Sequence, residues 1–316
     1  MTEPPFSQLD PRKFRDPFIT AKGERRARVA LKSLDTLWFN TGTLCNLTCQ
    51  HCYIESSPKN DRLIYLTAAE VAEYLDEIEA GGLPTSLIGF TGGEPFMNPE
   101  LPGMLENVLS RGFRALVLTN AMKPMAKCKP ALLKLRDRFG DRLTIRVSID
   151  HYGPQVHEFE RGERSWRPTI DGLLWLAHNG FSPHVASRRL SGEPEAAIRS
   201  GFAALFDEIG VDIDPDDPVA LMVFPEMDPG TDVPEITEAC WGILHKSPAE
   251  VMCASSRMVV KRKGAAQPAV VACTLLPYAP EFELGATLAE ASSAVRLNHP
   301  HCAKFCVLGG ASCSRG

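Results

Sequence analysis

No long apolar run occurs in this chain of 316 residues, and basic charge is not in excess. A membrane-spanning helix needs about 18 consecutive apolar residues, and the N-terminal segment lacks the apolar stretch of a secretory signal. These absences predict a cytoplasmic protein that does not bind a membrane. The formal net charge of −5 provides no broad positive field for nucleic acid. Hydrophobic residues make up 44% and charged residues 23%, which excludes a disordered chain and is typical of a globular enzyme.

Cysteine, by contrast, is abundant: the chain has ten. Disulfides are rare in a reducing compartment, so metal ligands or reactive thiols are the expected roles. One group lies at residues 45–52 and another at 253–313, which predicts two metal sites. Cys128 and Cys240 fall between the groups, and Cys128 is interpreted as an inert thiol.

Strands alternate with helices from residue 34 to residue 225, which predicts an α/β fold with a parallel sheet. Six such units are too few for a closed eight-stranded barrel, so a partial barrel or an open sheet is expected. Expected strands are 34–40, 86–90, 115–119, 143–149, 184–188 and 219–224; expected helices are 67–80, 99–111, 130–139, 169–178 and 195–209.

Three further segments flank this alternating region. Residues 1–33 contain eight Lys/Arg against four Asp/Glu and are predicted to form a solvated arm, with docking to an acidic partner as the alternative. Residues 226–239 form an acidic linker, and residues 240–316 form a small module with a β-hairpin, at 257–261 and 269–273, and many cysteines. Such a module is too small for a large core and is expected to need a metal.

The segment TLCNLTCQHCY at 43–53 carries the strongest chemical signal. Its three cysteines, Cys45, Cys49 and Cys52, follow the first strand at its carboxyl end, where barrel enzymes build active sites. A cubane iron–sulfur cluster normally takes four cysteines, so three would leave one iron open to a ligand. A zinc knuckle is the alternative, with His51 between the last two cysteines as a possible fourth ligand.

The segment GFTGGEP at 89–95 ends the second strand. Paired glycines let a backbone approach a ligand closely, and Glu94 can help to hold an ammonium group. With the three-cysteine loop, this segment resembles the radical S-adenosylmethionine (radical SAM) superfamily over residues 34–225. The resemblance implies a partial (β/α)6 TIM-like barrel. It also implies a [4Fe–4S] cluster on the three cysteines, whose open iron chelates S-adenosylmethionine (SAM) and whose electron releases a 5′-deoxyadenosyl radical.

The resemblance also implies which side chains bind SAM. His51 precedes the third cysteine, where the family places a group beside the adenine, and polar residues at the ends of the third and fourth strands match positions that often bind ribose. Arg188 ends the fifth strand and is a candidate partner for the SAM carboxylate or for an anionic substrate group. The full candidate set is His51, Tyr53, Gly92, Gly93, Glu94, Asn120, Ser148, Asp150 and Arg188.

The C-terminal cysteines resemble the SPASM or Twitch extensions of radical SAM enzymes. Only five cysteines occur from residue 253 onward, six with Cys240, which is too few for two fully ligated clusters. The resemblance therefore implies one auxiliary [4Fe–4S] cluster, with a zinc site using His299 or His301 as the alternative. Its expected ligands are Cys253, Cys273, Cys302 and Cys306, and Cys313 could replace one of them.

Lys and Arg are absent from residues 200–245, which contain eleven Asp/Glu, including DIDPDD at 212–217. This stretch is either a solvated acidic loop or a segment beside the barrel mouth that selects a cationic or polyhydroxylated substrate.

The predicted function is that of a radical SAM oxidoreductase acting on a small biosynthetic molecule, with the auxiliary cluster assisting oxidation or substrate binding. The 33 residues before the barrel are too few for a peptide-recognition domain, so maturation of a ribosomally made peptide is the second hypothesis. A non-enzymatic iron–sulfur carrier or scaffold is the third. A flavodoxin or ferredoxin is the expected electron donor, and no residue is assigned as catalytic.

Overall fold

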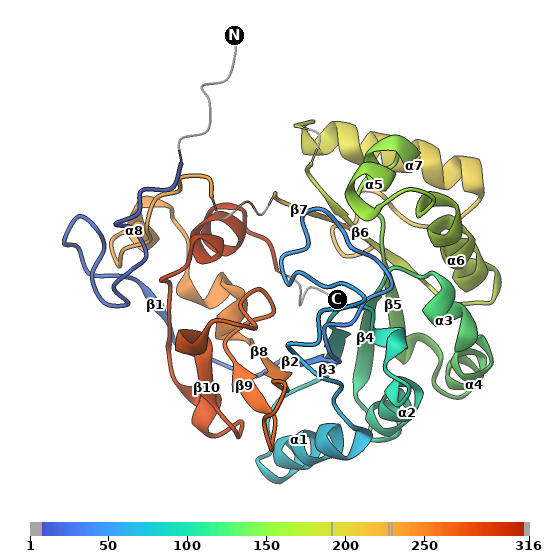
Figure 1. The fold of residues 1–316 in the computed structure, drawn as a ribbon, viewed down its shortest axis with the longest axis horizontal. Helices are drawn as coiled ribbons and strands as arrows, with labels where there is room; N and C mark the ends of the chain where they lie inside the picture. Colours follow the sequence, from blue (N-terminus) through green and yellow to red (C-terminus); the bar gives the residue numbers. More distant parts are fainter. Residues whose placement is uncertain (1–7, 191, 227, 229, 313–316) are drawn as a thin grey trace.

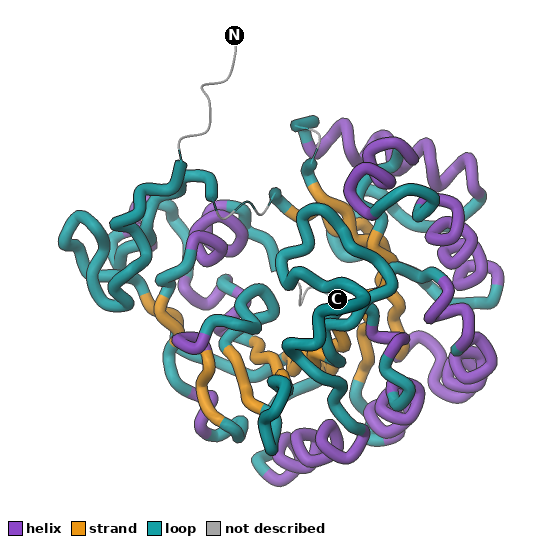
Figure 2. Tube along the Cα trace, in the orientation of Figure 1, coloured by secondary structure: helices purple, strands orange, loops and turns teal. Residues whose placement is uncertain are grey.

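The structure is a computed structural model that describes residues 8–190, 192–226, 228 and 230–312. A nine-stranded sheet, in the order β10-β9-β8-β2-β3-β4-β5-β6-β7, forms its centre (Figures 1 and 2). The six strands from β2 to β7 are all parallel to their neighbours. Their bounds are β2 Thr36–Asn40, β3 Leu87–Thr91, β4 Arg114–Thr119, β5 Leu143–Ser148, β6 His184–Arg188 and β7 Leu221–Phe224. The six predicted strands are therefore confirmed, with ends moved by one or two residues.

Helices cover the outer face of this curved sheet (Figure 1). They are α1 Ala68–Ala80, α2 Leu101–Ser110, α3 Lys123–Lys127, α4 Lys129–Phe139, α5 Pro154–Arg161, α6 Trp166–His178 and α7 Glu195–Ile209. Thr67 caps α1: its side chain accepts from the Glu70 amide, while the Glu70 carboxylate accepts from the Thr67 amide. The sequence did not predict α5, which begins after Gly153 with Pro154 in its first turn.

The barrel is partial, as predicted, because the sheet does not close on itself. Strand β8 (Ser256–Val260) pairs parallel to β2, so the hairpin formed with β9 (Ala269–Val271) continues the barrel sheet. Strand β10 (Glu283–Gly285) completes that side. The predicted hairpin is confirmed, and its parallel pairing to the barrel is a long-range contact that hairpin spacing alone does not reveal. The boundary predicted at residues 226–239 stays a prediction.

The hydrophobic core has two parts. One lies between the sheet and the helices, and the other joins Trp38, Leu87 and Leu116 of the barrel to residues 251–307. We call residues 240–312, the described part of the C-terminal module, the tail. Its short elements are α8 Cys240–Ile243, 3-10 turns at Pro248–Glu250, Met252–Ala254, Pro280–Phe282 and Glu290–Ser292, strand β11 Val295–Arg296 and a π-helix at Cys302–Leu308. Further 3-10 turns lie at Pro95–Met97 and Gly140–Arg142 in the barrel.

The basic arm is docked onto the tail rather than solvated throughout. Strand β1 (Arg28–Val29) pairs antiparallel with β11, and the fully buried Arg26 forms an ion pair with Glu235. For residues 8–33, the prediction of a solvated arm is therefore wrong, because Arg26, Ala27 and Val29 are buried.

The acidic hexapeptide at 212–217 lies between α7 and β7, at the amino end of the strand. The active-site edge of a parallel barrel is the opposite one, at the carboxyl ends of the strands. For this hexapeptide, the hypothesis that it selects a substrate at the barrel mouth is wrong, and the solvated-loop interpretation holds. Among the described residues, no helix combines the length and the apolar character that crossing a bilayer requires.

Candidate functional site

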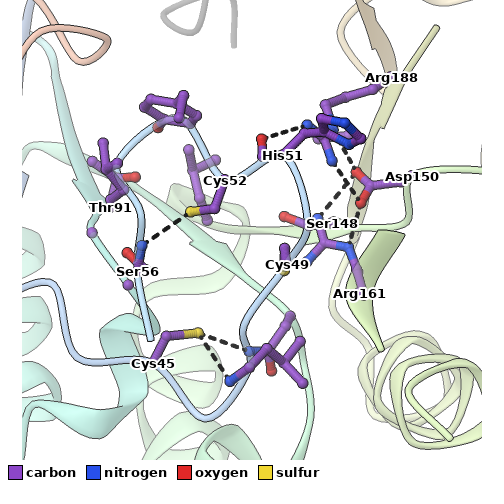
Figure 3. A pocket seen from close by; sticks show the side chains of 18 of the residues that line it. Cys45, Cys49, His51, Cys52, Ser56, Thr91, Ser148, Asp150, Arg161 and Arg188 are labelled. Carbon is purple, nitrogen blue, oxygen red and sulfur yellow. Dashed lines mark hydrogen bonds and ion pairs between the residues drawn. The ribbon is translucent and has the colours of Figure 1, made fainter. Parts of the chain in front are cut away.

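A cavity opens at the carboxyl ends of the parallel strands (Figure 3). It contains about 1010 Å³ of space not filled by atoms, part of it open to solvent. Cys45, Cys49 and Cys52 line it, together with every predicted SAM-binding residue except Glu94. The fold thus brings together residues that are up to 260 positions apart, from Cys45 to Phe305.

The three cysteines lie in a loop between β2 and α1, residues 41–66, which we call the cysteine loop. Its backbone is fixed by a bond from the Cys45 amide to the Ser57 carbonyl, 3.1 Å. The Cys45 sulfur accepts from the Leu47 amide at 3.4 Å, and the Cys52 sulfur accepts from the Ser56 amide at 3.3 Å. Amides directed at thiol sulfurs stabilise negative charge there, as the ligands of an iron–sulfur cluster require.

The burial and the raised pKa values of Cys45 and Cys49 suit these thiols to bind a cluster. Burial raises the pKa of Cys45 to about 12 and also raises the pKa of Cys49, although the nearby Arg161 opposes that shift. Such thiols are neutral when free and become thiolates when they bind a metal. No three His, Cys, Asp or Glu side chains in the described parts of the chain are arranged to hold a single metal ion.

The paired glycines of GGEP pack against the cysteine loop. The Gly93 amide donates to the Gly42 carbonyl at 2.8 Å, and the Glu94 amide donates to the Leu44 carbonyl at 3.0 Å. A Cβ on Gly93 would lie 2.2 Å from the Leu44 carbonyl oxygen, and Gly92 has a φ of +136°. The two glycines are thus required because two backbone segments approach each other closely. The sequence had instead predicted a close approach between a backbone and a ligand.

Glu94 is buried beneath the cavity wall rather than on its surface. Its carboxylate accepts from the Thr119 hydroxyl at 2.8 Å and from the Asn120 amide at 2.9 Å, and it also caps the turn at Phe96. Burial raises the pKa of Glu94 to about 7, although these hydrogen bonds act in the opposite direction. Glu94 therefore joins the ends of β3 and β4 and orients Asn120 toward the Cys45 sulfur, 4.0 Å away.

Charged residues line one side of the cavity, and Figure 3 shows Asp150 between Arg161 and Arg188. Asp150 is paired with Arg161, 2.8 Å, and with Arg188, 3.1 Å. Burial alone would raise the pKa of Asp150, but the two guanidinium groups outweigh burial and hold that pKa well below its usual range. Both carboxylate oxygens are engaged, so Asp150 fixes the two arginines.

Glu160 connects this network to the cysteine loop. Its carboxylate accepts from the His51 amide at 2.9 Å and lies 2.7 Å from His51 Nδ1, and it pairs with Arg188. Arg188 in turn donates to the His51 carbonyl at 3.0 Å. Glu160 and Arg161 were missed by the sequence analysis because α5 was missed, and the Gly153-Pro154 pair that starts α5 was the available signal.

Apolar side chains also line the cavity, and we call them the apolar wall. Leu118, Ala186 and Phe224 extend from the barrel strands, while Leu275 and Phe305 come from the tail. The rings of Phe224 and Phe305 lie 5.4 Å apart between centroids. The tail therefore completes the cavity, and its aromatic contribution comes from the π-helix between two of its cysteines.

Three tail cysteines lie together at the open end of the β8–β9 hairpin. Cys253 precedes β8, Cys273 follows β9, and each affects the electrostatics of Cys302. Burial raises the pKa of Cys253 to about 12 and that of Cys302 well above its usual value. Cys306 lies four residues beyond Cys302 on the same π-helix. These grouped thiols fit the donor set of a cluster.

The remaining cysteine candidates differ in their placement. Cys240 accepts from the Thr237 amide at 3.3 Å, and Cys128 begins helix α4 in the barrel. Cys313 lies outside the described residues. His299 and His301 pack against each other, with 4.7 Å between ring centroids, and burial lowers the pKa of each to about 4.

Comparisons with known proteins agree with this geometry. The profile of the Radical SAM superfamily matches residues 39–192. The antilisterial bacteriocin subtilosin biosynthesis protein AlbA of Bacillus subtilis (strain 168) is 29% identical over 143 residues, 45% of this chain and 30% of AlbA. A 7-carboxy-7-deazaguanine synthase of Methanopyrus kandleri is 30% identical over 132 residues, 36% of this chain and 50% of the synthase. The chain thus spans half or less of the length of these relatives.

The fold is also found in a solved structure. The crystal structure of Streptococcus suis SuiB bound to S-adenosylmethionine superimposes with a TM-score of 0.58 and 12% identity, covering 80% of this chain and 63% of SuiB. The match to the Radical SAM superfamily covers just under half of the chain, and its α/β fold agrees with that of SuiB, as the sequence predicted. A radical SAM domain implies a [4Fe–4S] cluster and SAM as cofactors.

Proposed function

We propose that the protein is a radical SAM oxidoreductase that abstracts hydrogen from a small biosynthetic molecule. The observation that carries this proposal is the convergence of Cys45, Cys49 and Cys52 on one cavity with eight of the nine predicted SAM-binding residues. When bound there, the cluster and SAM supply an electron and a 5′-deoxyadenosyl radical. The chain's own residues position these groups and exclude water.

Each side of the cavity has a separate role in this proposal. Gly93 and Glu94 fix the cysteine loop against the ends of β3 and β4, and the three cysteines of this loop would hold the cluster at the cavity. Thr91, Asn120 and Ser148 present polar groups along the strand ends for SAM. The apolar wall, with Phe224 and Phe305, is left for the substrate.

We further propose that the tail holds one auxiliary [4Fe–4S] cluster through Cys253, Cys273, Cys302 and a fourth ligand, Cys306 or Cys313. Phe305 reaches the cavity from the same π-helix that carries Cys302 and Cys306. Two of the candidate ligands of this cluster thus lie on the same short helix as a residue of the cavity lining. That position suits an acceptor for the electron left on the substrate after hydrogen abstraction.

Maturation of a ribosomally made peptide is the second candidate. It is supported by two similar proteins: AlbA is a bacteriocin biosynthesis protein, and SuiB has been crystallised with precursor peptide SuiA. The 7-carboxy-7-deazaguanine synthase is named for a small-molecule product and supports the first candidate. A gene for a short peptide beside this one would favour the second, and co-expression followed by mass spectrometry of that peptide would decide between them.

The radical SAM chemistry is tested by anaerobic reconstitution. We expect about eight irons per chain, for two cubanes, and about four after Cys45, Cys49 and Cys52 are all replaced by Ala. Cys49→Ala should abolish formation of 5′-deoxyadenosine from SAM under reducing conditions. Continued formation of 5′-deoxyadenosine at the wild-type rate would refute the proposal.

The role of the auxiliary cluster has its own test. Cys273→Ala and Cys302→Ala should keep SAM cleavage but stop completion of the product, because the substrate radical loses its acceptor. Circular dichroism and SAM affinity serve as folding controls. A folded variant that lacks the tail cluster and still completes the product would show that the cluster is structural.

A further inference from the structure

Arg257 is a buried cation without a carboxylate partner. Its side chain is 1% exposed, on strand β8 directly after the Cys253 turn. Its guanidinium donates only to main-chain carbonyls: Cys253 at 2.6 Å, Ser256 at 2.8 Å, Ala291 at 2.8 Å and Ser293 at 3.2 Å. Among the residues that the structure describes, no carboxylate forms an ion pair with it.

Two other arginines, Arg26 and Arg161, show a carboxylate partner of the kind that Arg257 lacks. Arg26 is equally buried and is paired with Glu235, and Arg161 is paired with Asp150. A guanidinium cannot lose its proton in a protein, so its charge persists wherever it is buried. A buried charge is costly unless an opposite charge accompanies it, and carbonyl dipoles compensate it only in part. The position of Arg257 thus requires an anion that the protein side chains around it do not supply.

The groups that act on Arg257 identify that anion. Cys253 and Cys273 are the two groups whose negative charge would favour the guanidinium, and both belong to the tail cysteine group. The carbonyl of Cys253, a proposed cluster ligand, accepts a hydrogen bond from the Arg257 guanidinium. The cation is therefore in direct contact with the backbone of that ligand. A cluster with four thiolate ligands is a compact anion, and each reduction adds one further negative charge.

We propose that Arg257 is the buried counter-cation of the auxiliary cluster, which it holds in place and whose reduced form it stabilises most. This inference rests on the tail cluster of the proposed function. A fixed positive charge attracts the reduced cluster more strongly than the oxidised one, since the reduced cluster carries the additional electron. Arg257 therefore raises the midpoint potential of the cluster and makes it a better electron acceptor. It is a positioning residue, because it does not reach the cavity.

The test uses the full chain in which Cys45, Cys49 and Cys52 are replaced by Ala, so that only the tail cluster contributes a signal. Iron content and the midpoint potential, from a dithionite titration followed by electron paramagnetic resonance, are measured for this parent, for Arg257→Met and for Arg257→Lys. Methionine removes the charge, whereas lysine keeps the charge and loses the planar fork that bridges several carbonyls. The matched pair thus separates charge from hydrogen bonding.

We expect the potential of Arg257→Met to shift to more negative values, with Arg257→Lys close to the parent. Loss of iron in Arg257→Met with retention in Arg257→Lys would support the proposal equally. Equal potentials in all three proteins, equal shifts in both variants, or equal loss of iron from both variants would overturn it. A parent without iron would instead refute the tail cluster itself, before any change at Arg257 is considered.

Discussion

Replacing Asp150 by Asn would leave Arg161, whose side chain is only 13% exposed, without its counter-charge. The Asp150 side chain is 2% exposed, and Arg161 pairs with no other carboxylate among the described residues. Arg188 is less affected, because it keeps its ion pair with Glu160. Breaking one buried ion pair by removing one partner costs about 3–5 kcal/mol. We therefore expect Asp150→Asn to lower the free energy of unfolding by about that amount.

Urea unfolding of the metal-free protein under anaerobic conditions measures this change. The control is Asp171→Asn, which removes an exposed pair with Arg167 on α6 and should cost no more than about 0.5 kcal/mol. Adding Arg161→Met to Asp150→Asn should recover much of the loss, because it removes the unpaired charge. An Asp150→Asn cost no larger than the control's would refute the desolvated network.

The ion pairs of Asp150 also predict that the stability of the protein depends on pH. Arg161 and Arg188 hold the pKa of Asp150 below its unfolded value, which is about 3.9 for an aspartate. The stabilisation is therefore fully present above that pH and is lost progressively as the pH falls below it. SAM affinity distinguishes the alternative role: a large loss of SAM affinity in Asp150→Asn with unchanged stability would indicate direct ribose binding instead.

Two further predictions concern the GGEP segment. Gly93→Ala should displace the cysteine loop, because its Cβ would lie 2.2 Å from the Leu44 carbonyl oxygen. The iron content of the barrel site should therefore fall. The control Gly103→Ala should leave the iron content unchanged, because its Cβ meets nothing within 4 Å. Because burial raises the pKa of Glu94 to about 7, its native state holds a proton that the unfolded state loses near pH 4.5, so stability should decrease as pH rises between these values. Glu94→Gln should remove that decrease in urea midpoints measured across the range, and an unchanged slope would contradict the assignment.

The sequence alone determined the parts of the fold that depend on neighbouring residues. Thr67 and Glu70 are three positions apart and cap α1 by local hydrogen bonds, so their spacing suffices to predict the helix start. The order of strands and helices likewise follows from local apolar periods. The cysteine spacing and GGEP are short motifs, and they indicated the superfamily without knowledge of any distant contact.

Tertiary structure decided which distant residues complete the site. Nothing local to Glu160 or Arg161 reveals that α5 places them against the cysteine loop, more than 100 residues earlier in the chain. Phe305 and Leu275 reach the cavity because β8 adds to the barrel sheet beside β2, and such parallel pairing depends on buried area and backbone hydrogen bonds between distant segments. The same long-range packing turns Glu94 inward and leaves Arg257 without a carboxylate. Short-range motifs therefore specify which cysteines and glycines form the candidate site, while the packing of distant segments sets the charges around that site and encloses its cavity.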